Sequence, residues 1–209
     1  MSVVIMGAGS YGEVYSFYLK FAGVKVDWFL DDDPAKLGKK IGGVEVIGSS
    51  SMISDLHKDG VTEFYCPIGV NRVRVELNRR ARASGLRTPN FVHSSALVHS
   101  TIPLDSGVYI LPGVVVMPCS EIQDDVMIST SATVAHHSKL GYGVFLSTGV
   151  SVGASMHLGD NVYVGMKATL VTGKVSKIGS DAVIGAGAVV LRDVLPFEVV
   201  VGVPARSID

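Results

Sequence analysis

Aliphatic side chains recur at every sixth position through the middle of the chain. The run holds for fourteen consecutive positions: Val92, Val98, Leu104, Ile110, Val116, Ile122, Ile128, Val134, Leu140, Leu146, Val152, Leu158, Val164 and Leu170. Neither the 3.6-residue period of an α-helix nor the two-residue period of an ordinary strand gives this spacing. We interpret it as a repeat of one short strand and one corner, with the aliphatic side chain pointing inward. Three units make a coil of roughly eighteen residues, and stacked coils predict a parallel β-helix.

Two further features of the repeat concern its corners and one interruption. Glycine directly follows the inward aliphatic residue in several units, where a tight corner favours a residue without a Cβ; these are Gly141, Gly153, Gly159, Gly165, Gly179 and Gly185. The period slips by two residues after Leu170 and resumes at Ile178. We therefore expect an extra loop at residues 172–177 (TGKVSK), and such loops often bind ligands.

Residues 1–88 follow a different pattern. Residues 3–6 predict a short buried strand, the turn Gly7-Ala-Gly9-Ser-Tyr-Gly12 opens a helix to about residue 22, and residues 25–30 predict a second strand that ends in acids. Glycines at this point let backbone N–H groups approach a phosphate, and the acids can accept hydrogen bonds from a sugar or a base. The alternative is a purely structural tight turn. We expect an α/β, Rossmann-like domain at residues 1–88 and a β-helix domain at residues 89–209.

The N-terminal region offers half of a dinucleotide fold. After a small hairpin at 41–47 it predicts only one more strand (63–67) and one more helix (71–84), which leaves room for one nucleotide rather than NAD. A nucleotide diphosphate sugar fits this space better. The turn from Ile68 to Arg72 lies at the same carboxyl edge of the predicted sheet, where it can contact substrate, although Asn71 and Arg72 could instead cap and solubilise the helix.

Composition excludes several classes of protein. The net charge is −1 and no basic run occurs, which argues against nucleic acid as the main partner. No stretch has the apolar length of a membrane span, and the N-terminus lacks a secretory leader. Cys66 and Cys119 are far apart and have no activating neighbour, so neither a disulfide nor a thiol nucleophile is expected. We expect a cytoplasmic protein without a metal site.

Two of the six histidines are candidates for acid–base chemistry. His136 and His137 follow Val134 by two and three positions, at a corner where side chains project outward, and a neutral imidazole there could take a proton from an attacking amine or hydroxyl. A solvated corner histidine is the alternative. The other four are expected at the surface, because none has a second ligand at metal spacing; they are His57, His93, His99 and His157.

The combination of motifs resembles the bacterial sugar acyltransferases. The segments GAGSYG, LDDD, IGVN, TVAHHSKLG and VVVGVPARSI are similar to those of nucleotide amino-sugar N-acetyltransferases and sialic acid O-acetyltransferases. The resemblance implies a left-handed β-helix, a homotrimer with active sites between subunits, and direct transfer from acetyl-CoA with His136 as general base. Backbone N–H groups near Gly153 or Gly165 are candidate donors to the oxyanion.

The resemblance also assigns binding residues. It places the phosphates at Ser10, Tyr11 and Gly12, the nucleotide's base at Asp31 and Asp32, and the substrate at Gly69. Acetyl-CoA would contact backbone at Met166 and Gly185. Phe145 stands where related enzymes have a second histidine near the acyl carrier, which is a departure from the family. In the predicted loop, Lys174 and Lys177 are available for the phosphates of CoA.

A second departure follows His136. The family usually has Glu or Asp at the next position, whereas this chain has His137, and a neutral imidazole cannot stabilise an imidazolium as a carboxylate does. A carboxylate from a neighbouring subunit could replace it, His136 could act unaided, or the enzyme could be slow or inactive. An amine needs less help than a hydroxyl, so we expect N-acetylation of a nucleotide-linked amino sugar in bacterial surface glycan biosynthesis. The alternatives are O-acetylation and a non-catalytic sugar-nucleotide-binding scaffold.

Overall fold

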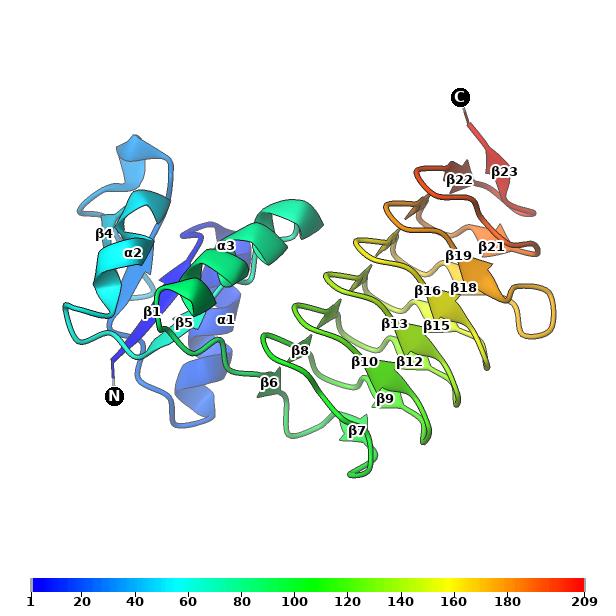
Figure 1. Ribbon diagram of the computed structural model, residues 1–209, viewed down its shortest axis with the longest axis horizontal. Helices are drawn as coiled ribbons and strands as arrows, with labels where there is room; N and C mark the ends of the chain where they lie inside the picture. The colour runs from blue at the N-terminus through cyan, green and yellow to red at the C-terminus, as the bar shows by residue number, and fades with distance from the viewer. Residues whose placement is uncertain (1, 209) are drawn as a thin grey trace. The chain divides into compact units, whose positions relative to one another are not determined.

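The chain divides between Pro89 and Asn90 into two units, each with a hydrophobic core of its own. The computed structural model describes residues 2–208 and is drawn in Figure 1. The first unit is a mixed sheet with helices, and the second is a β-helix. Each unit carries one group of the residues that the sequence singles out.

The N-terminal unit is a five-stranded sheet in the order β3-β4-β2-β1-β5, parallel except for β3. Its strands are β1 (Val3–Met6), β2 (Trp28–Leu30), β3 (Lys40–Ile41), β4 (Val44–Gly48) and β5 (Glu63–Tyr65). Its helices are α1 (Ser10–Phe21), α2 (Ile53–Leu56) and α3 (Asn71–Ala83), with single 3₁₀ turns η1 (Pro34–Lys36) and η2 (Ser50–Met52). The sequence predicted the strands and the two long helices but neither α2 nor the 3₁₀ turns.

The strand order creates a switch point between β1 and β5. After β1 the chain continues through α1 to β2 on one side, and it later crosses to β5 on the other side of β1. Connections that leave neighbouring strands in opposite directions open a crevice at their carboxyl ends, and open α/β sheets bind ligands there. The glycine turn after β1 and the Ile68–Gly69 turn after β5 therefore flank one crevice.

The second strand begins later than predicted. The sequence places it at residues 25–30, whereas β2 begins at Trp28. The Asp27 carboxylate, rather than a backbone carbonyl, accepts the N–H of Val3 at 3.0 Å. The Asp27 N–H still donates to the Val3 carbonyl at 3.0 Å, so the side chain takes over only the bond to the Val3 N–H.

The second unit is the β-helix that the six-residue period predicts. Its first sheet contains β6 (Phe91–Val92), β8 (Tyr109–Ile110), β11 (Met127–Ile128), β14 (Phe145–Leu146), β17 (Tyr163–Val164), β20 (Val183–Ile184), β22 (Val199–Val201) and the antiparallel β23 (Arg206–Ser207). We call it the aromatic sheet, after the rings of Phe91, Tyr109, Phe145 and Tyr163. Within it, β11, β14 and β17 pair in parallel with a shift of 18 residues, as in Met127 to Phe145 to Tyr163.

The other two sheets have different outward-facing side chains. The neutral sheet contains β7 (Leu97–Val98), β9 (Val115–Val116), β12 (Thr133–Val134), β15 (Ser151–Val152), β18 (Thr169–Leu170) and β21 (Val189–Val190). The charged sheet contains β10 (Glu121–Ile122), β13 (Lys139–Leu140), β16 (His157–Leu158) and β19 (Lys177–Ile178). Its outward ladder runs Glu121, Lys139, His157, Lys177, with a 2.8 Å ion pair between Lys139 and Glu121.

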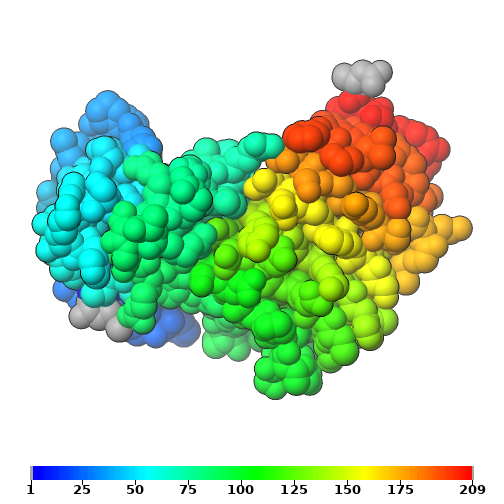
Figure 2. Space-filling model, in the orientation of Figure 1, coloured from blue at the N-terminus to red at the C-terminus, as the bar shows by residue number. Residues whose placement is uncertain are grey.

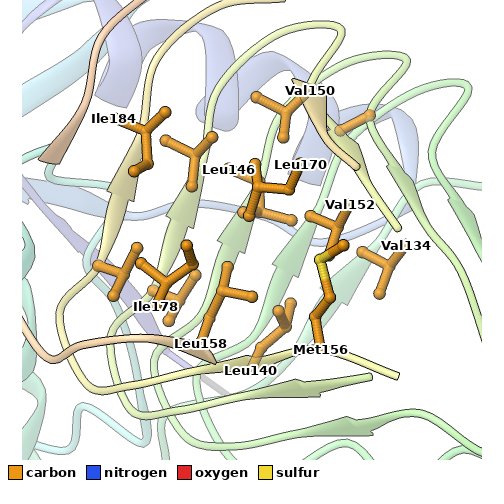
Figure 3. Close-up of a cluster of buried hydrophobic side chains, with 14 of the residues drawn as sticks. Val134, Leu140, Leu146, Val150, Val152, Met156, Leu158, Leu170, Ile178 and Ile184 are labelled. Carbon is orange, nitrogen blue, oxygen red and sulfur yellow. The ribbon is translucent and has the colours of Figure 1, made fainter. Parts of the chain in front are cut away.

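The second residue of nearly every short strand points into the prism. Figure 3 shows this column of aliphatic side chains, including Val134, Leu140 and Leu146, packed against the next coil. The three repeat positions of the first coil are the exceptions, because this coil has a neighbouring coil on one side only: Val92 is exposed, and Val98 and Leu104 are partly buried. The six-residue period predicts the core because three repeat units complete one coil, so each inward side chain stacks on the side chain 18 residues later.

Glycine is required at the corners for a different reason from the one the sequence suggests. The glycines that follow the inward residue have ordinary φ angles, but a Cβ at Gly165 would stand 2.6 Å from the backbone nitrogen of Ala186 in the next coil. The left-handed residue of these corners comes three positions after the inward residue. It is His137 after Val134, with φ 59°, and Ser155 after Val152, with φ 58°.

The predicted extra loop is present and is held in place from two sides. The register between β16 and β19 is 20 residues, from His157 to Lys177, instead of 18. Val175 reaches back from the loop into the core. Asp193 accepts hydrogen bonds from the N–H groups of Ser176 at 2.6 Å and Lys177 at 2.9 Å, as well as from the Ser176 hydroxyl at 2.8 Å. Figure 2 shows the loop in orange as a protrusion of the surface.

Candidate functional site

The glycine turn presents the open end of a helix. Gly7 adopts φ 100°, and the Glu13 N–H donates to the Gly9 carbonyl at 3.0 Å as the first hydrogen bond of α1. The N–H groups of Ser10, Tyr11 and Gly12 therefore precede the helical ladder, and no side chain caps this end. Aligned N–H groups and the helix dipole favour an anion here. A Cβ on Gly12 would collide with the Gly7 carbonyl oxygen, so Gly12 lets α1 approach the turn.

Asp31 supports the turn from inside the protein. One carboxylate oxygen accepts the Ala8 N–H at 2.7 Å and pairs with Lys36 Nζ at 2.9 Å, while the other accepts the Asp33 N–H at 2.9 Å. Burial alone would raise the pKa of this carboxyl, but these hydrogen bonds outweigh it and hold the pKa below its usual value. The side chain is only 13% exposed. The sequence assigned Asp31 to ligand binding, whereas its contacts here brace the turn.

Asp32 is the more accessible of the two acids. It is exposed, and its Oδ1 accepts the N–H of Ser50, the first residue of η2, at 2.8 Å. The carboxylate therefore lies at the carboxyl edge of the sheet, where the sequence places a contact with the nucleotide's base. That role stays a prediction for Asp32.

The third turn depends on an arginine that sequence reasoning missed. Gly69 is exposed, as a substrate contact requires, but Asn71 is only 7% exposed and its Oδ1 accepts from Arg74 Nη2 at 3.1 Å. Arg74 is fully buried, and its Nη1 donates to the Ile68 carbonyl at 2.7 Å. Asn71 therefore orients Arg74 and neither caps the helix nor faces solvent. A charged residue on the buried face of α3, three positions before Leu77, was the available signal.

His136 and His137 are in direct contact at a corner between the neutral and charged sheets. Their Nδ1 atoms lie 2.9 Å apart, and the rings are perpendicular with centroids 5.1 Å apart. Both side chains are exposed. The His136 carbonyl accepts the Ser155 N–H at 3.0 Å, which fixes this corner to the next coil.

A groove of about 780 Å³ runs from His136 along this edge of the β-helix, which we call the His136 edge. The extra loop forms one wall, and the lining includes Ser155, Lys174, Arg192 and Asp193. Its size lies in the range of small-molecule sites. The structure thus brings His136 and Lys174 together, whereas Lys177 starts β19 on the charged sheet and does not line the groove.

The other predicted cofactor residues lie elsewhere. Met166 is 55% exposed in the corner between the aromatic and neutral sheets, and Gly185 occupies the same corner one coil later. We call this the Met166 edge. Phe145 is 6% exposed and meets Tyr163 edge-on at 5.5 Å between ring centroids, so it offers little surface to a cofactor. One chain does not gather all the predicted cofactor residues in one place.

The expected oxyanion donors are already used. The N–H of Gly153 donates to the Leu170 carbonyl at 3.1 Å, and that of Gly165 donates to the Ile184 carbonyl at 2.7 Å. The neighbouring Ala154 N–H donates to Thr172 Oγ1 at 3.0 Å. These three groups hold consecutive coils together, so Gly153, Gly165 and Ala154 do not offer their own N–H groups to an oxyanion. An oxyanion donor elsewhere near Gly153 or Gly165 stays a prediction.

The remaining histidines have structural or surface positions. His93 Nδ1 pairs with the hydroxyl of Ser95 and His99 Nδ1 with that of Thr101, each at 2.8 Å, which closes two corners of the first coils. His57 and His157 are exposed. Within residues 2–208, no group of three or more His, Cys, Asp or Glu side chains is placed to hold a metal ion. None of the helices in the same range is long and apolar enough to cross a membrane.

A second pocket lies in the N-terminal unit. It has a volume of about 490 Å³ and is lined by Phe17, Lys20, Lys25 and the Gly42–Gly43 turn. These residues belong to the end of α1 and the start of β4, at the amino edge of the sheet. The glycine turn occupies the opposite edge, so this pocket plays no part in the site.

Comparison with known proteins assigns the chain to a family. Residues 2–81 match the PglD N-terminal domain. A GDP-perosamine N-acetyltransferase variant from Caulobacter crescentus, solved with CoA and GDP-perosamine, is 32% identical over 100% of this chain and 97% of its own, with a TM-score of 0.93. The chain belongs to the hexapeptide-repeat sugar acyltransferases. It is therefore an acyltransferase, and the left-handed β-helix that the resemblance implied is confirmed.

Two other solved structures have a similar fold. The acetyltransferase domain of PglB from Neisseria gonorrhoeae FA1090, solved with acetyl coenzyme A, is 26% identical over 99% of this chain and 98% of its own, with a TM-score of 0.89. WeeI from Acinetobacter baumannii AYE is 19% identical over 100% of this chain and 100% of its own, with a TM-score of 0.73, which shows that the fold is shared.

Proposed function

We propose that this protein is an acetyl-CoA-dependent N-acetyltransferase that acts on a nucleotide-linked amino sugar in bacterial surface glycan biosynthesis. The observation that carries the proposal is the similarity along the whole chain to an N-acetyltransferase solved with CoA and GDP-perosamine. Two features of this chain support it. The open N-terminus of α1 suits a diphosphate, and the groove at His136 suits an acyl carrier.

The nucleotide part of the substrate is held by the N-terminal unit. The phosphates accept hydrogen bonds from the N–H groups of Ser10, Tyr11 and Gly12, Asp32 contacts the base, and Gly69 approaches the sugar across the crevice between β1 and β5. Asp31 and Arg74 contribute by fixing the two turns. These contacts are remote from the reacting atoms, so they set affinity more than the rate of the chemical step.

Acetyl transfer takes place at His136 without a covalent intermediate on the protein. The sugar amine attacks the thioester carbonyl while His136 Nε2 takes its proton. The new C–N bond forms, the C–S bond breaks, and His136 returns the proton to the departing sulfur. The products are the N-acetylated sugar nucleotide and CoA, with no net change in protons.

We further propose that the active sites are completed in a homotrimer. Lys174 and His136 lie on one edge of the neutral sheet, and Met166 and Gly185 lie on its other edge. If the Met166 edge of one copy faces the His136 edge of the next, all four residues meet, and three copies close a ring. The outward side chains of the neutral sheet support such packing, because most are small and none is charged; they are Leu97, Val115, Thr133, Ser151, Thr169 and Val189. Sedimentation equilibrium should give three times the mass of the chain.

The experiment that tests the function is product analysis. The protein is incubated with acetyl-CoA and GDP-, UDP- and TDP-linked amino sugars, together with the matching sugars that carry hydroxyl in place of the amine. We expect an acetylated amino-sugar nucleotide whose acetyl group survives mild alkali, because an amide resists hydrolysis that cleaves an ester. Products labile to alkali would instead indicate O-acetylation. Binding without turnover for every substrate would indicate the scaffold.

A further inference from the structure

His136 and His137 form a hydrogen bond whose direction can be deduced. The two Nδ1 atoms are 2.9 Å apart, so one proton lies between them; two bare nitrogens would repel, and two N–H groups would clash. Consecutive residues of an extended chain point to opposite sides. Here His137 adopts the left-handed conformation, φ 59°, which turns its ring back toward His136.

Only one direction of this bond is compatible with a base at His136. Its Nδ1 is engaged by His137, so Nε2 is the nitrogen that can act in the groove. A neutral His136 with a bare Nε2 must carry its proton on Nδ1, and His137 must accept that proton on its own Nδ1. The proton of His137 then resides on its Nε2.

Within one chain, the described lining of the groove offers no acid that could take over the role of His137. Three charged residues line the groove, Lys174, Arg192 and Asp193, and Asp193 is the only carboxylate among its described lining residues. The Asp193 carboxylate is occupied by Ser176 and Lys177, and the guanidinium of Arg192 pairs with Glu198 at 2.6 Å. In the adjoining coils, the equivalent corner positions are Cys119 and Ser155, neither of which is a carboxylate.

We propose that His137 is a positioning residue that replaces the usual carboxylate with a neutral acceptor. Its Nδ1 accepts the Nδ1–H of His136, which fixes the tautomer and the orientation of His136 and keeps Nε2 free for the amine. This inference rests on the proposed role of His136 as general base. When His136 takes the proton of the amine, the Nδ1 proton stays in place and the hydrogen bond becomes charge-assisted.

Three variants of His137 separate the effect of a hydrogen-bond acceptor from the effect of a negative charge. Asn supplies an uncharged acceptor, Asp supplies a charged one, and Gly supplies none. All three tolerate a positive φ, and Asn and Asp carry an oxygen on Cγ, where histidine carries Nδ1. We expect His137→Gly to lower kcat about tenfold, the effect of losing one such hydrogen bond, and His137→Asn to restore it to within about threefold of wild type. His137→Asp should move the acid limb of kcat/KM to higher pH, because a carboxylate stabilises the imidazolium, and His137→Asn should leave that limb in place.

The ¹⁵N resonances of the His136 ring test the tautomer without any need for activity. In selectively labelled protein at alkaline pH, assigned by comparison with His136→Ala, we expect a protonated Nδ1 and a bare Nε2, and a loss of this preference in His137→Gly. A protonated Nε2 with a bare Nδ1, or equal kcat in the Gly and Asn variants, would overturn the proposal. Failure of the general-base role would show itself separately, as full activity in His136→Ala.

Discussion

The carboxylate of Asp31 accepts the N–H of Ala8 at 2.7 Å, which joins the end of β2 to the glycine turn after β1. An acid at this place can hold a ligand or hold the turn that binds the ligand. Its three hydrogen bonds within the chain favour the second role.

Replacement of Asp31 should therefore affect both stability and affinity. Asp31→Ala leaves the N–H of the buried Ala8 without its acceptor, which costs about 1–3 kcal/mol of unfolding free energy. The loosened turn should raise the KM for the sugar nucleotide with little change in kcat, because the contact is remote from the chemistry. Urea unfolding and calorimetric titration measure the two effects.

Asp32→Ala is the matched control for the effect on stability, because Asp32 is exposed and its carboxylate accepts only the N–H of Ser50. We expect it to weaken nucleotide binding with a smaller loss of stability. Undiminished nucleotide binding in both variants would remove the N-terminal unit from the mechanism.

The two lysines of the extra loop should differ in their contribution to acetyl-CoA binding. Lys174 lines the groove beside His136, whereas Lys177 stands on the charged sheet. We expect Lys174→Ala to weaken acetyl-CoA binding and to reduce its dependence on salt, since it removes a charge near the phosphates. Lys177→Ala should change the affinity for acetyl-CoA and its salt dependence only a little. Equal effects of the two substitutions, or none from either, would contradict the assignment of the groove to CoA.

The closing coil of the β-helix should lose stability in acid. Arg192 pairs with Glu198 at 2.6 Å, and the Leu195 N–H donates to the same carboxylate at 2.8 Å. The hydrogen bond from Arg192, followed by that from Leu195, lowers the pKa of Glu198 from 4.5 to about 2. A carboxyl with a lowered folded-state pKa stabilises the protein above its unfolded pKa and loses this contribution as the pH falls through the folded value.

The difference in Tm between wild type and Glu198→Gln should therefore be constant above about pH 5 and should shrink between about pH 4.5 and pH 2. Thermal unfolding of both proteins across this range measures it, and the comparison cancels the other carboxyls that titrate there. A difference that does not change with pH would show that Glu198 acts through packing alone.

The β-helix and its extra loop were predictable, because the spacing of the aliphatic residues determines which side chains point inward. Each inward side chain, such as Val134 or Leu140, recurs with the period of the coil, and the two-residue slip after Leu170 locates the loop. The bond between His136 and His137 was not predictable, because neighbouring side chains normally diverge and only the positive φ of His137 brings them together. Arg74 was missed because a buried charge is rare, and because its partners, the Ile68 carbonyl and the Asn71 side chain, are not recognisable in the sequence as a binding site for a guanidinium.

The central claim is that His136 removes the proton from the attacking amine. The most direct test is the steady-state rate of His136→Ala with acetyl-CoA and the amino-sugar nucleotide that the wild type acetylates, together with calorimetric binding of both substrates. We predict a loss of roughly 10² to 10⁴ in kcat with both affinities retained, the range expected when a general base is removed. Full activity in His136→Ala would contradict the account at its central residue.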